Sequence, residues 1–463
     1  MAFLPHFFLL YQIMSGGNLV VHRARQTGAA RNGAATNGLQ RCVVMVGRRR
    51  LPGAAAFHRV GIAPAPGSSN AERDAIQDHA MTDVTVLNSR PRRAPPRIDE
   101  TKVSQALQDL FAGWRRSLKE PFKGLTANGE IERGLFPLRK TGASVQPMID
   151  AARAFLNSLD RDQRAAVHFD VDGETWRTWS NIHRNLMRHG LCLAELGDQQ
   201  RELAFGVLRA GLGVRAFETA RDAMKLNEHL AELTGLPDEF GEFYYWISIF
   251  GEPSPDAPWG WQFDGHHCNI NCFVLGDQMV LSPMLLGSEP VLAESGAYKG
   301  TTVLREEEAE GWAFMNTLTP KQRAKAVIGM DLPFDGYASG FKDNIVVPYG
   351  GLPATAMTPA QRHQFIGLIT LYTDRLPVAH AKVRLEEIRQ HLERTVFAWI
   401  GEFDPVSPFY YRIYSPVIFI EFYHQPGVAL PNTGYNRRHA HALVRTPNGN
   451  DYGRDLLNQY RSL

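Results

Sequence analysis

The chain has 463 residues, of which 44% are hydrophobic and 21% are charged, and its formal net charge is +2 at pH 7. This composition is typical of a globular protein long enough for one large domain or two moderate ones. A net charge so close to zero, with no basic stripe in the predicted folded part, argues against a nucleic-acid partner.

The first 95 residues are predicted to lie outside the folded domain. Residues 1–14, MAFLPHFFLLYQIM, are apolar but shorter than the roughly 20 residues of a membrane span. The following stretch is rich in arginine and has no acidic residue before Glu72, as in transit peptides. It lacks an amphipathic period, which favours the alternative that translation starts at Met81. Residues 90–97, RPRRAPPR, are then a solvated linker, and residues 96–463 form a single domain.

Residues from 102 to about 233 are predicted to be mostly helical. The segment TKVSQALQDLFAGWRRSL places Val103, Leu107 and Leu110 at helical spacing. A long helical run from 201 to 233 is broken at Gly211-Leu212-Gly213. This break resembles a dinucleotide-binding loop, but it follows a helical pattern rather than a strand, so a nucleotide cofactor is not supported.

One phrase occurs three times, as LDRDQR at 159–164, LTPKQR at 318–323 and MTPAQR at 357–362. Each copy has Asp or Thr where a helix N-cap belongs, and two have Pro at the first helical position. The unequal spacing excludes a solenoid. We interpret the phrase as three helix starts that share the same local chemistry, and expect further helices at about 306–328 and 359–399.

The strands are predicted in two groups. Residues 242–253 form a strand, and residues 260–285 form a hairpin that turns at Gly276-Asp277. Near the C-terminus, residues 409–424 are rich in β-branched and aromatic side chains, and residues 437–445 are predicted as a further short strand. Because strands and helices are grouped rather than alternating, we predict an α+β fold with a helical N-terminal half packed on a mainly antiparallel sheet.

The four cysteines are Cys42, Cys192, Cys268 and Cys272. The last two lie about 13 Å apart along one predicted strand, which is too far for a disulfide. Their spacing matches no zinc motif, so we expect a reducing compartment and a cytoplasmic location. Cys268 beside a histidine is a candidate nucleophile, but a cysteine within a strand is more often a small buried hydrophobe.

The adjacent pair His266-His267 is the first candidate for metal ligation. On a straight strand His267 shares a face with Asn269 and Asn271, and this polar face suits the lining of a cavity. His266 points the other way and reaches the same site only if the chain bends or bulges near Gly265.

A second histidine cluster is His439-Ala440-His441, whose two imidazoles share one face of a strand and suit Zn, Cu, Fe or Ni. Glu421 lies in an otherwise apolar strand, VIFIEFYH, where an unpaired carboxylate is costly and requires a cation. That cation is either a metal ion or an arginine, and Arg412 and Arg445 are the nearby candidates. In the second case the histidines lie on a solvated face.

The motifs of other enzyme classes are missing from the sequence. It contains no Gly-x-Ser-x-Gly elbow, no His-Glu-x-x-His and no Walker loop.

Four segments, WGWQFDGHHCNINCFVLGD, LSPMLLGSEPV, YYRIYSPVIFIEF and HAHALVRTPNGNDYGRDLL, taken in this order, resemble the uncharacterised family called domain of unknown function 3500. The resemblance covers about residues 150–460. It implies no reaction, but it implies that the two histidine clusters are features of the family. The arginine-rich N-terminus has no counterpart there, which favours a start at Met81. The matching positions are His266, His267, Pro283, Gly287, Pro290, Arg412, Pro416, Glu421, His439, His441, Arg445, Asp451 and Gly453.

We therefore predict a metal-dependent enzyme, an oxidoreductase acting on a small polar or anionic molecule. The expected cofactor is a divalent Fe, Cu, Mn or Zn ion. The alternatives are a zinc-dependent hydrolase and a non-catalytic protein that binds a small anion. The predicted metal ligands are His266, His267, Glu421, His439 and His441, and the predicted catalytic residues are Arg412, Arg445 and Asn271, with Asn269 as a further contact.

Overall fold

A sheet of 12 strands organises the protein, of which the computed structural model describes residues 93–182, 188–340, 342–431 and 434–463. The predicted N-terminal extension, with Met81 and Cys42, lies outside these residues. The strands are β1 (His168–Phe169), β2 (Leu191–Cys192), β3 (Tyr245–Phe250), β4 (Trp259–Gly265), β5 (Cys268–Leu275), β6 (Gln278–Ser288), β7 (Val327–Gly329), β8 (Leu352–Pro353), β9 (Val396–Ile400), β10 (Tyr410–Tyr414), β11 (Phe419–Pro426) and β12 (Tyr435–Arg445).

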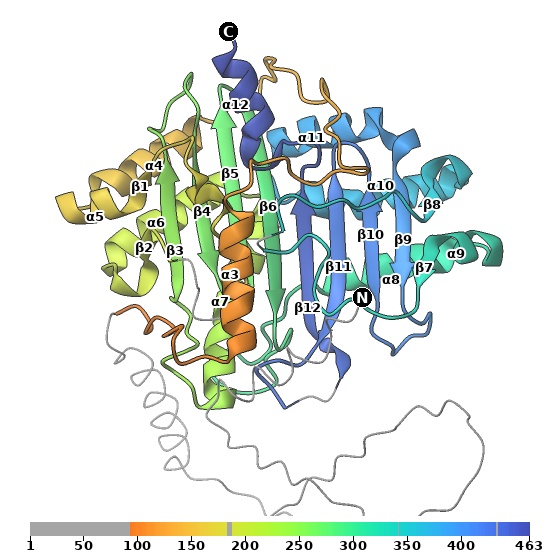
Figure 1. The fold of residues 1–463 in the computed structure, drawn as a ribbon, viewed down its shortest axis with the longest axis horizontal. Helices are drawn as coiled ribbons and strands as arrows, with labels where there is room; N and C mark the ends of the chain where they lie inside the picture. The colour runs from red at the N-terminus through yellow and green to blue at the C-terminus, as the bar shows by residue number, and fades with distance from the viewer. Residues whose placement is uncertain (1–92, 183–187, 341, 432–433) are drawn as a thin grey trace, which may run out of the picture. The chain divides into compact units, whose positions relative to one another are not determined.

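The strand order is β1-β3-β4-β5-β6-β12-β11-β10-β9-β7, with β2 paired to β3 and β8 paired to β9. Neighbouring strands are antiparallel except for the outer pairs β1–β3 and β7–β9. Figure 1 shows the green strands of the first half and the blue strands of the second half side by side in this one sheet. The prediction of a mainly antiparallel sheet is confirmed.

The helices are distributed along the whole described chain. They are α3 (Gln105–Ser117), α4 (Gln146–Asn157), α5 (Arg161–Val167), α6 (Asp198–Gly211), α7 (Val214–Thr234), α8 (Arg305–Thr317), α9 (Pro320–Ala326), α10 (Pro359–Thr373), α11 (Val378–Gln390) and α12 (Arg454–Arg461). The α+β class is confirmed, as are helices in the two later segments expected to contain them, but the N-terminal half is not the predominantly helical layer that was predicted. Among the described helices, none is both long enough and apolar enough to cross a membrane.

The order of elements repeats along the chain, and this explains why helices occur in both halves. The first repeat runs α4–α5–β1–β2–α6–α7–β3–β4–β5–β6, and the second runs α8–α9–β7–β8–α10–α11–β9–β10–β11–β12. The sheet order is symmetric about the central β6–β12 pair.

The strand registers of the two repeats correspond residue by residue. Phe250 pairs with Gly260, and 150 residues later Ile400 pairs with Tyr410. Likewise Gln262 pairs with Asn271, and the pair 150 residues later is Arg412 with Glu421. Gly251 and Gly401 both have positive φ, and each amide bonds to the carbonyl of the outer parallel strand.

The repeated hexapeptide begins helices α5, α9 and α10, as predicted. Asp160, Thr319 and Thr358 each accept a backbone N–H at the N-cap, and the glutamine three residues later closes a capping box. A fourth version, Gly197-Asp198-Gln199-Gln200-Arg201, begins α6, which occupies the place of α10 in the first repeat.

The two faces of the sheet are covered differently. On the helix face, Trp261 donates its indole N–H to Met148 of α4, and Tyr411 donates to the carbonyl of Glu307 of α8. On the other face, which we call the loop face, Gln262 donates to the carbonyl of Trp176, in a connecting segment. Because neighbouring residues of a strand point to opposite faces, the polar residues that alternate with Trp261 and Tyr411 all lie on the loop face.

The predicted hairpin at residues 260–285 is part of a three-stranded unit. The turn at Gly276-Asp277 joins β5 to β6, as expected, but a second turn at His266-His267 joins β4 to β5. The helix expected at 359–399 is also divided, into α10 and α11, and its last residues form β9. Short apolar runs such as VFAWI are ambiguous between buried strand and buried helix, which accounts for this error.

Glu308 connects helix α8 to strands β11 and β12. His424 Nε2 and Arg437 Nε donate to its carboxylate at 3.1 and 2.6 Å. Burial raises the pKa of Glu308. The hydrogen bonds and electrostatic interactions with His424 and Arg437 outweigh this effect and lower the pKa of Glu308 to about 2. Burial lowers the pKa of His424, whose Nδ1 accepts the Phe409 N–H at 3.0 Å, so His424 is neutral and Arg437 supplies the charge.

Replacing Glu308 by glutamine is expected to lower the free energy of unfolding by about 2 kcal/mol at pH 7. A carboxyl whose folded-state pKa lies below its unfolded value stabilises the protein above about pH 4.5 and loses this effect as the pH falls towards 2. Urea unfolding of wild type and Glu308→Gln at pH 7, 5 and 3.5 should therefore show a shrinking difference. Glu306→Gln, at an exposed neighbouring position, is the control. A difference that does not change with pH would contradict this account.

Candidate metal centre

His266 and His267 form the tip of the β4–β5 hairpin rather than part of a strand. Gly265 pairs with Cys268, so the two histidines are the two turn residues between them. The prediction that His267 shares a strand face with Asn269 and Asn271 is therefore wrong, because the turn ends the alternation. The carbonyl of His267 accepts the Gly287 N–H at 2.8 Å and fixes the tip against β6.

His267 has a left-handed backbone conformation, with φ of 60°. A residue with a bulky side chain pays about 1–2 kcal/mol for this conformation, and glycine pays almost none. Strained residues of this kind concentrate at functional sites, where the surrounding structure holds them in place. With this backbone conformation, the His267 ring lies beside the rings of His439 and His441 on strand β12.

His439 and His441 lie on β12, two residues apart and therefore on the same face of the sheet. His441 faces Tyr423 of β11 on one side and Gly287 of β6 on the other. A Cβ atom at position 287 would lie 2.3 Å from the His441 ring, so only glycine leaves room for this imidazole. Strand β12 and the tip of the β4–β5 hairpin thus bring three imidazoles together.

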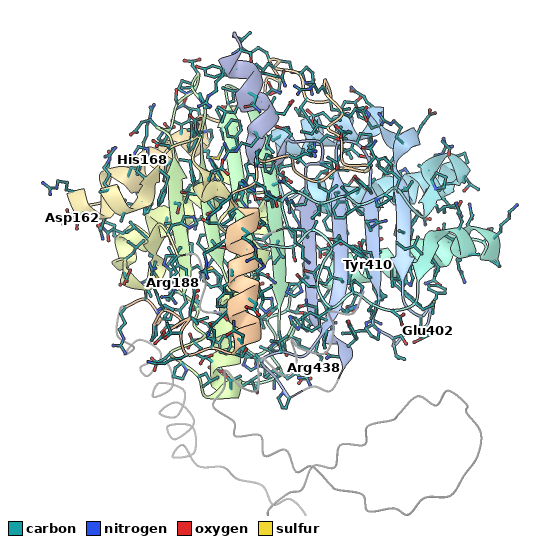
Figure 2. The ribbon with its side chains drawn as sticks, in the orientation of Figure 1. Asp162, His168, Arg188, Glu402, Tyr410 and Arg438 are labelled. Carbon is teal, nitrogen blue, oxygen red and sulfur yellow. The ribbon has the colours of Figure 1, made fainter. Side chains whose placement is uncertain are left out.

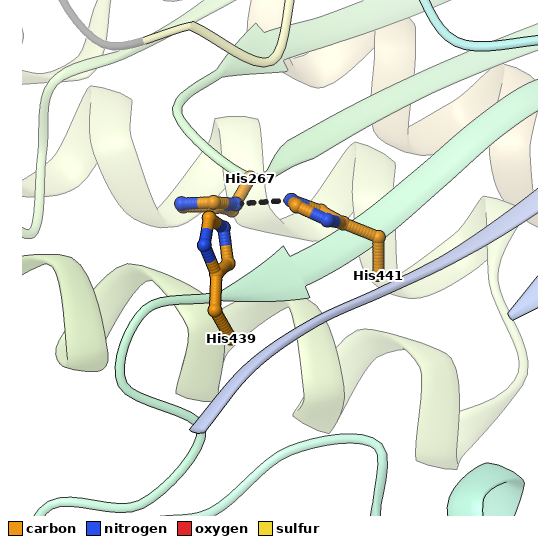
Figure 3. Close-up of side chains that lie close together, drawn as sticks. All are labelled: His267, His439 and His441. Atoms are coloured by element: carbon orange, nitrogen blue, oxygen red, sulfur yellow. Dashed lines mark hydrogen bonds between the residues drawn. The ribbon is translucent and has the colours of Figure 1, made fainter. Parts of the chain in front are cut away.

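One ring nitrogen from each of His267, His439 and His441 lies within 4.8 Å of the other two. Figure 3 shows the rings of His267 and His441 facing one another, with His267 Nδ1 and His441 Nε2 joined by a hydrogen bond of 2.7 Å. All three side chains are buried, with exposed fractions of 5%, 2% and 0%. The group contains three of the five residues predicted as metal ligands.

The second nitrogens of the rings are consistent with metal ligation. His439 Nδ1 bonds to the Pro426 carbonyl at 2.9 Å and lies 3.7 Å from the Glu289 carboxylate. Histidine ligands usually donate their other ring N–H to such groups, which leaves the remaining nitrogen for the ion. Among the described residues, His439 Nε2 and His441 Nδ1 have no hydrogen-bond partner.

Burial, with a smaller contribution from neighbouring histidines, holds the pKa of His441 well below its usual range. The imidazole is therefore neutral at pH 7, and neutral imidazole is the form that binds metals. With metal–nitrogen bonds of about 2.1 Å, two ligand nitrogens lie at most about 4.2 Å apart. The three ring nitrogens, which lie within 4.8 Å of one another, must therefore move closer together to hold one ion.

Two of the five predicted ligands lie outside this group. The ring of His266 packs against that of His267, at 3.9 Å between centroids, but its Nδ1 bonds to Asn227 of α7 at 2.8 Å. Glu421 accepts the backbone N–H groups of Tyr337 and Ala338 at 2.9 and 3.0 Å and the Tyr410 hydroxyl at 2.7 Å.

These three hydrogen bonds therefore offset part of the cost of burying the Glu421 carboxylate. Tyr410, labelled in Figure 2, stands among the strands of the second repeat. Burial raises the pKa of Glu421, and these donors and Arg412 oppose that rise.

Two of the three predicted catalytic residues have structural partners. Arg445 is fully buried, and its guanidinium bonds to Asp451 at 2.8 Å, to Asp343 at 3.3 Å and to the Ala338 carbonyl at 2.7 Å. Asn271 accepts from Gln262 at 2.5 Å and donates to the Pro283 carbonyl at 2.9 Å.

Asn269 donates to the carbonyls of Ser180 and Gly265. Arg412, in contrast, makes no hydrogen bond with any described residue.

Cys268 is fully buried on β5, and burial raises the pKa of its thiol far above the usual range. The thiol stays protonated at pH 7, which is the behaviour of a small buried hydrophobe. Cys192 and Cys272 are also buried and free.

Glu289 is a residue of the site that the sequence did not suggest. It lies at the end of β6, is 2% exposed, and accepts the backbone N–H groups of residues 428–430, which fixes the chain that leads into β12. Its carboxylate is also the one nearest to His439 Nδ1. The available signal was a carboxylate within the apolar run MLLGSEPV, the same signal that drew attention to Glu421.

The comparisons with known proteins identify a family and nothing closer. No match was found among curated proteins, and none among solved structures. The family described as Protein of unknown function (DUF3500) matches residues 141–454, which include both repeats and all three histidines. From the extent of this match, the chain is a member of the DUF3500 family.

Proposed function

We propose that the protein is a metal-dependent enzyme whose ion is held by His267, His439 and His441. The observation that carries the proposal is the convergence of three buried imidazoles from two separate segments, one of them at a strained turn position. The turn conformation of His267, the close-approach glycine at position 287 and the carbonyl partner of His439 hold the three rings next to one another.

The donor set favours particular ions. Three imidazoles without a carboxylate suit Zn, Cu and Fe, whereas Mn prefers oxygen ligands. With Fe or Cu the centre would support an oxidoreductase, which is the class we propose, acting on a small polar or anionic molecule. The ion would supply the redox chemistry, and the protein would supply the three ligands and a buried environment.

A second candidate is a zinc-dependent hydrolase. It is favoured by the loss of Glu421 from the ligand set, because three histidines with one open position form a known type of catalytic zinc site. The identity of the metal bound by the protein distinguishes the oxidoreductase from the hydrolase.

Elemental analysis of the purified full-length chain and of a His439→Ala/His441→Ala variant tests the proposal. We expect about one equivalent of a transition metal per wild-type chain and a loss of it in the variant. A His363→Ala variant, changed at a histidine outside the cluster, should keep the metal. Iron or copper would support the oxidoreductase, and zinc the hydrolase. A metal-free wild type that also fails to bind each ion on reconstitution would refute both.

A further inference from the structure

Arg412 is a buried arginine for which the described residues provide no acceptor. It lies on β10, is 4% exposed, and has no described carboxylate within 4 Å and no hydrogen bond to a described residue. Two residues along on the same face, the hydroxyl of Tyr414 is also buried without a partner. Buried polar groups in native proteins almost always have a hydrogen-bond partner. Two neighbouring buried donors without an acceptor therefore need an explanation.

The first repeat shows what this position looks like when it has only a structural role. Gln262 is the residue equivalent to Arg412, and Asn271 is equivalent to Glu421. The Gln262 amide donates to Asn271 at 2.5 Å and to the Trp176 carbonyl at 2.9 Å. The fold thus completes this pair with two neutral side chains and does not need an arginine.

Glu421 does not act as the missing partner, although it faces Arg412 across the strand pair. Its two oxygens already accept from two backbone N–H groups and from the Tyr410 hydroxyl. The Arg412 guanidinium lies instead beside aromatic rings, 5.8 Å from the centre of Tyr337 and 5.9 Å from that of Phe419.

Partly exposed residues lie directly over Arg412 and Tyr414. Tyr349 packs on Tyr414 at 4.4 Å between ring centres, and Tyr349 and Tyr337 are 40% and 41% exposed. Gly350 lies next to the guanidinium, where an added Cβ would be 3.7 Å from an Arg412 terminal nitrogen. Arg412 and Tyr414 are therefore separated from solvent by two tyrosine rings and a glycine.

We propose that Arg412 and Tyr414 bind the carboxylate group of a small molecule. A guanidinium pairs with two parallel carboxylate oxygens, and a tyrosine hydroxyl adds a donor. One arginine with a carboxyl group nearby suits a single negative charge better than the two charges of a phosphate. The aromatic surroundings suit an apolar or aromatic body attached to the carboxylate. This site is inferred independently of any metal at the histidines.

Calorimetric titration of the metal-stripped full-length chain with benzoate and acetate, in EDTA, tests this site. We expect saturable binding, tighter for benzoate, by wild type and by Arg209→Gln, which removes an exposed arginine. Arg412→Gln, which installs the residue of the first repeat, should bind at least about tenfold more weakly. Tyr414→Phe should bind more weakly than wild type. Inorganic phosphate and sodium chloride at equal ionic strength are the comparison anions.

The melting temperature provides a second measurement. Without ligand, Arg412→Gln should melt close to the wild-type temperature, because Arg412 makes no hydrogen bond with a described residue and glutamine already occupies the equivalent position of the first repeat. A clear drop in the melting temperature would show that Arg412 is a structural partner of Glu421 and would overturn the site. Equal carboxylate affinity in wild type and Arg412→Gln, no binding by either, or tighter binding of phosphate would also overturn it. Because no metal is present, these outcomes leave the histidine centre untouched.

Discussion

Replacing Arg445 by methionine is expected to lower the free energy of unfolding by about 3–5 kcal/mol. The guanidinium is fully buried and compensates the carboxylates of Asp451 and Asp343, which lie at 2.8 and 3.3 Å. Methionine fills similar space but leaves Asp451 buried without a cation, while Asp343 keeps only its pairing with Arg177 at 2.7 Å. Burial already raises the pKa of Asp451 against the opposing effect of Arg445. Guanidinium chloride unfolding followed by circular dichroism measures the loss.

The matched control is Arg394→Met, which breaks the pairing of Arg394 with Glu132 at the surface. Here both side chains are almost half exposed, at 49% and 43%, so solvent screens the charges and the loss should stay within about 1 kcal/mol. Similar losses for the two variants would mean that burial of the Arg445 network does not determine its contribution to stability.

Replacing His267 by glycine is expected to weaken metal binding by more than about 100-fold and to leave the metal-free protein about 1 kcal/mol more stable than His267→Ala, which lacks the same ring. Loss of an outer hydrogen-bond partner of a ligand typically costs 10–100-fold in affinity, and loss of a ligand costs more. The difference in stability arises because glycine adopts φ of 60° without strain. Metal titration and urea unfolding in EDTA measure the two effects.

The variant His267→Ala separates strain from ligation. Alanine also removes the imidazole, so metal affinity should fall equally, but its Cβ retains the strain and the metal-free protein should be less stable than the glycine variant. If the two metal-free variants were equally stable, the backbone at position 267 would not be strained. If glycine left the metal affinity unchanged, His267 would not be a ligand.

The sequence predicted the fold class and most strands because these segments carry strong local signals. Aromatic and β-branched residues indicated β3 and β10, and the Gly276-Asp277 turn was correctly placed. The three hexapeptides were correctly interpreted as helix starts, but the repeat to which they belong was not recognised. Their place in two equivalent series of elements depends on strand registers such as Phe250–Gly260 and Ile400–Tyr410, which bring together residues that local patterns cannot connect.

The candidate site was predictable in part. Spacing alone placed His439 and His441 on one face. His267 was expected to join them from a strand, and a bend was expected only for His266, whereas the structure has a turn at both residues and places His267 in the group. The role of Glu421 could not be foreseen, because its partners are backbone groups of a distant loop. The same applies to Arg445, whose acidic partners lie at positions 343 and 451. Burial of a charge was visible in the sequence, but the identity of its partner was not.

The central β6–β12 pair has a consequence for how the histidine centre arose. Met284 and Val444 pair with each other, and they pair with Ile270 and Ile420, which are equivalent residues of the two repeats. In a two-fold symmetric homodimer, equivalent residues of the two subunits contact each other across the interface. Here the two repeats of one chain make the same kind of contact. A homodimer must carry every substitution twice. Two repeats within one chain are free of that constraint, and the hairpin position that holds His267 in one half holds Val417 in the other.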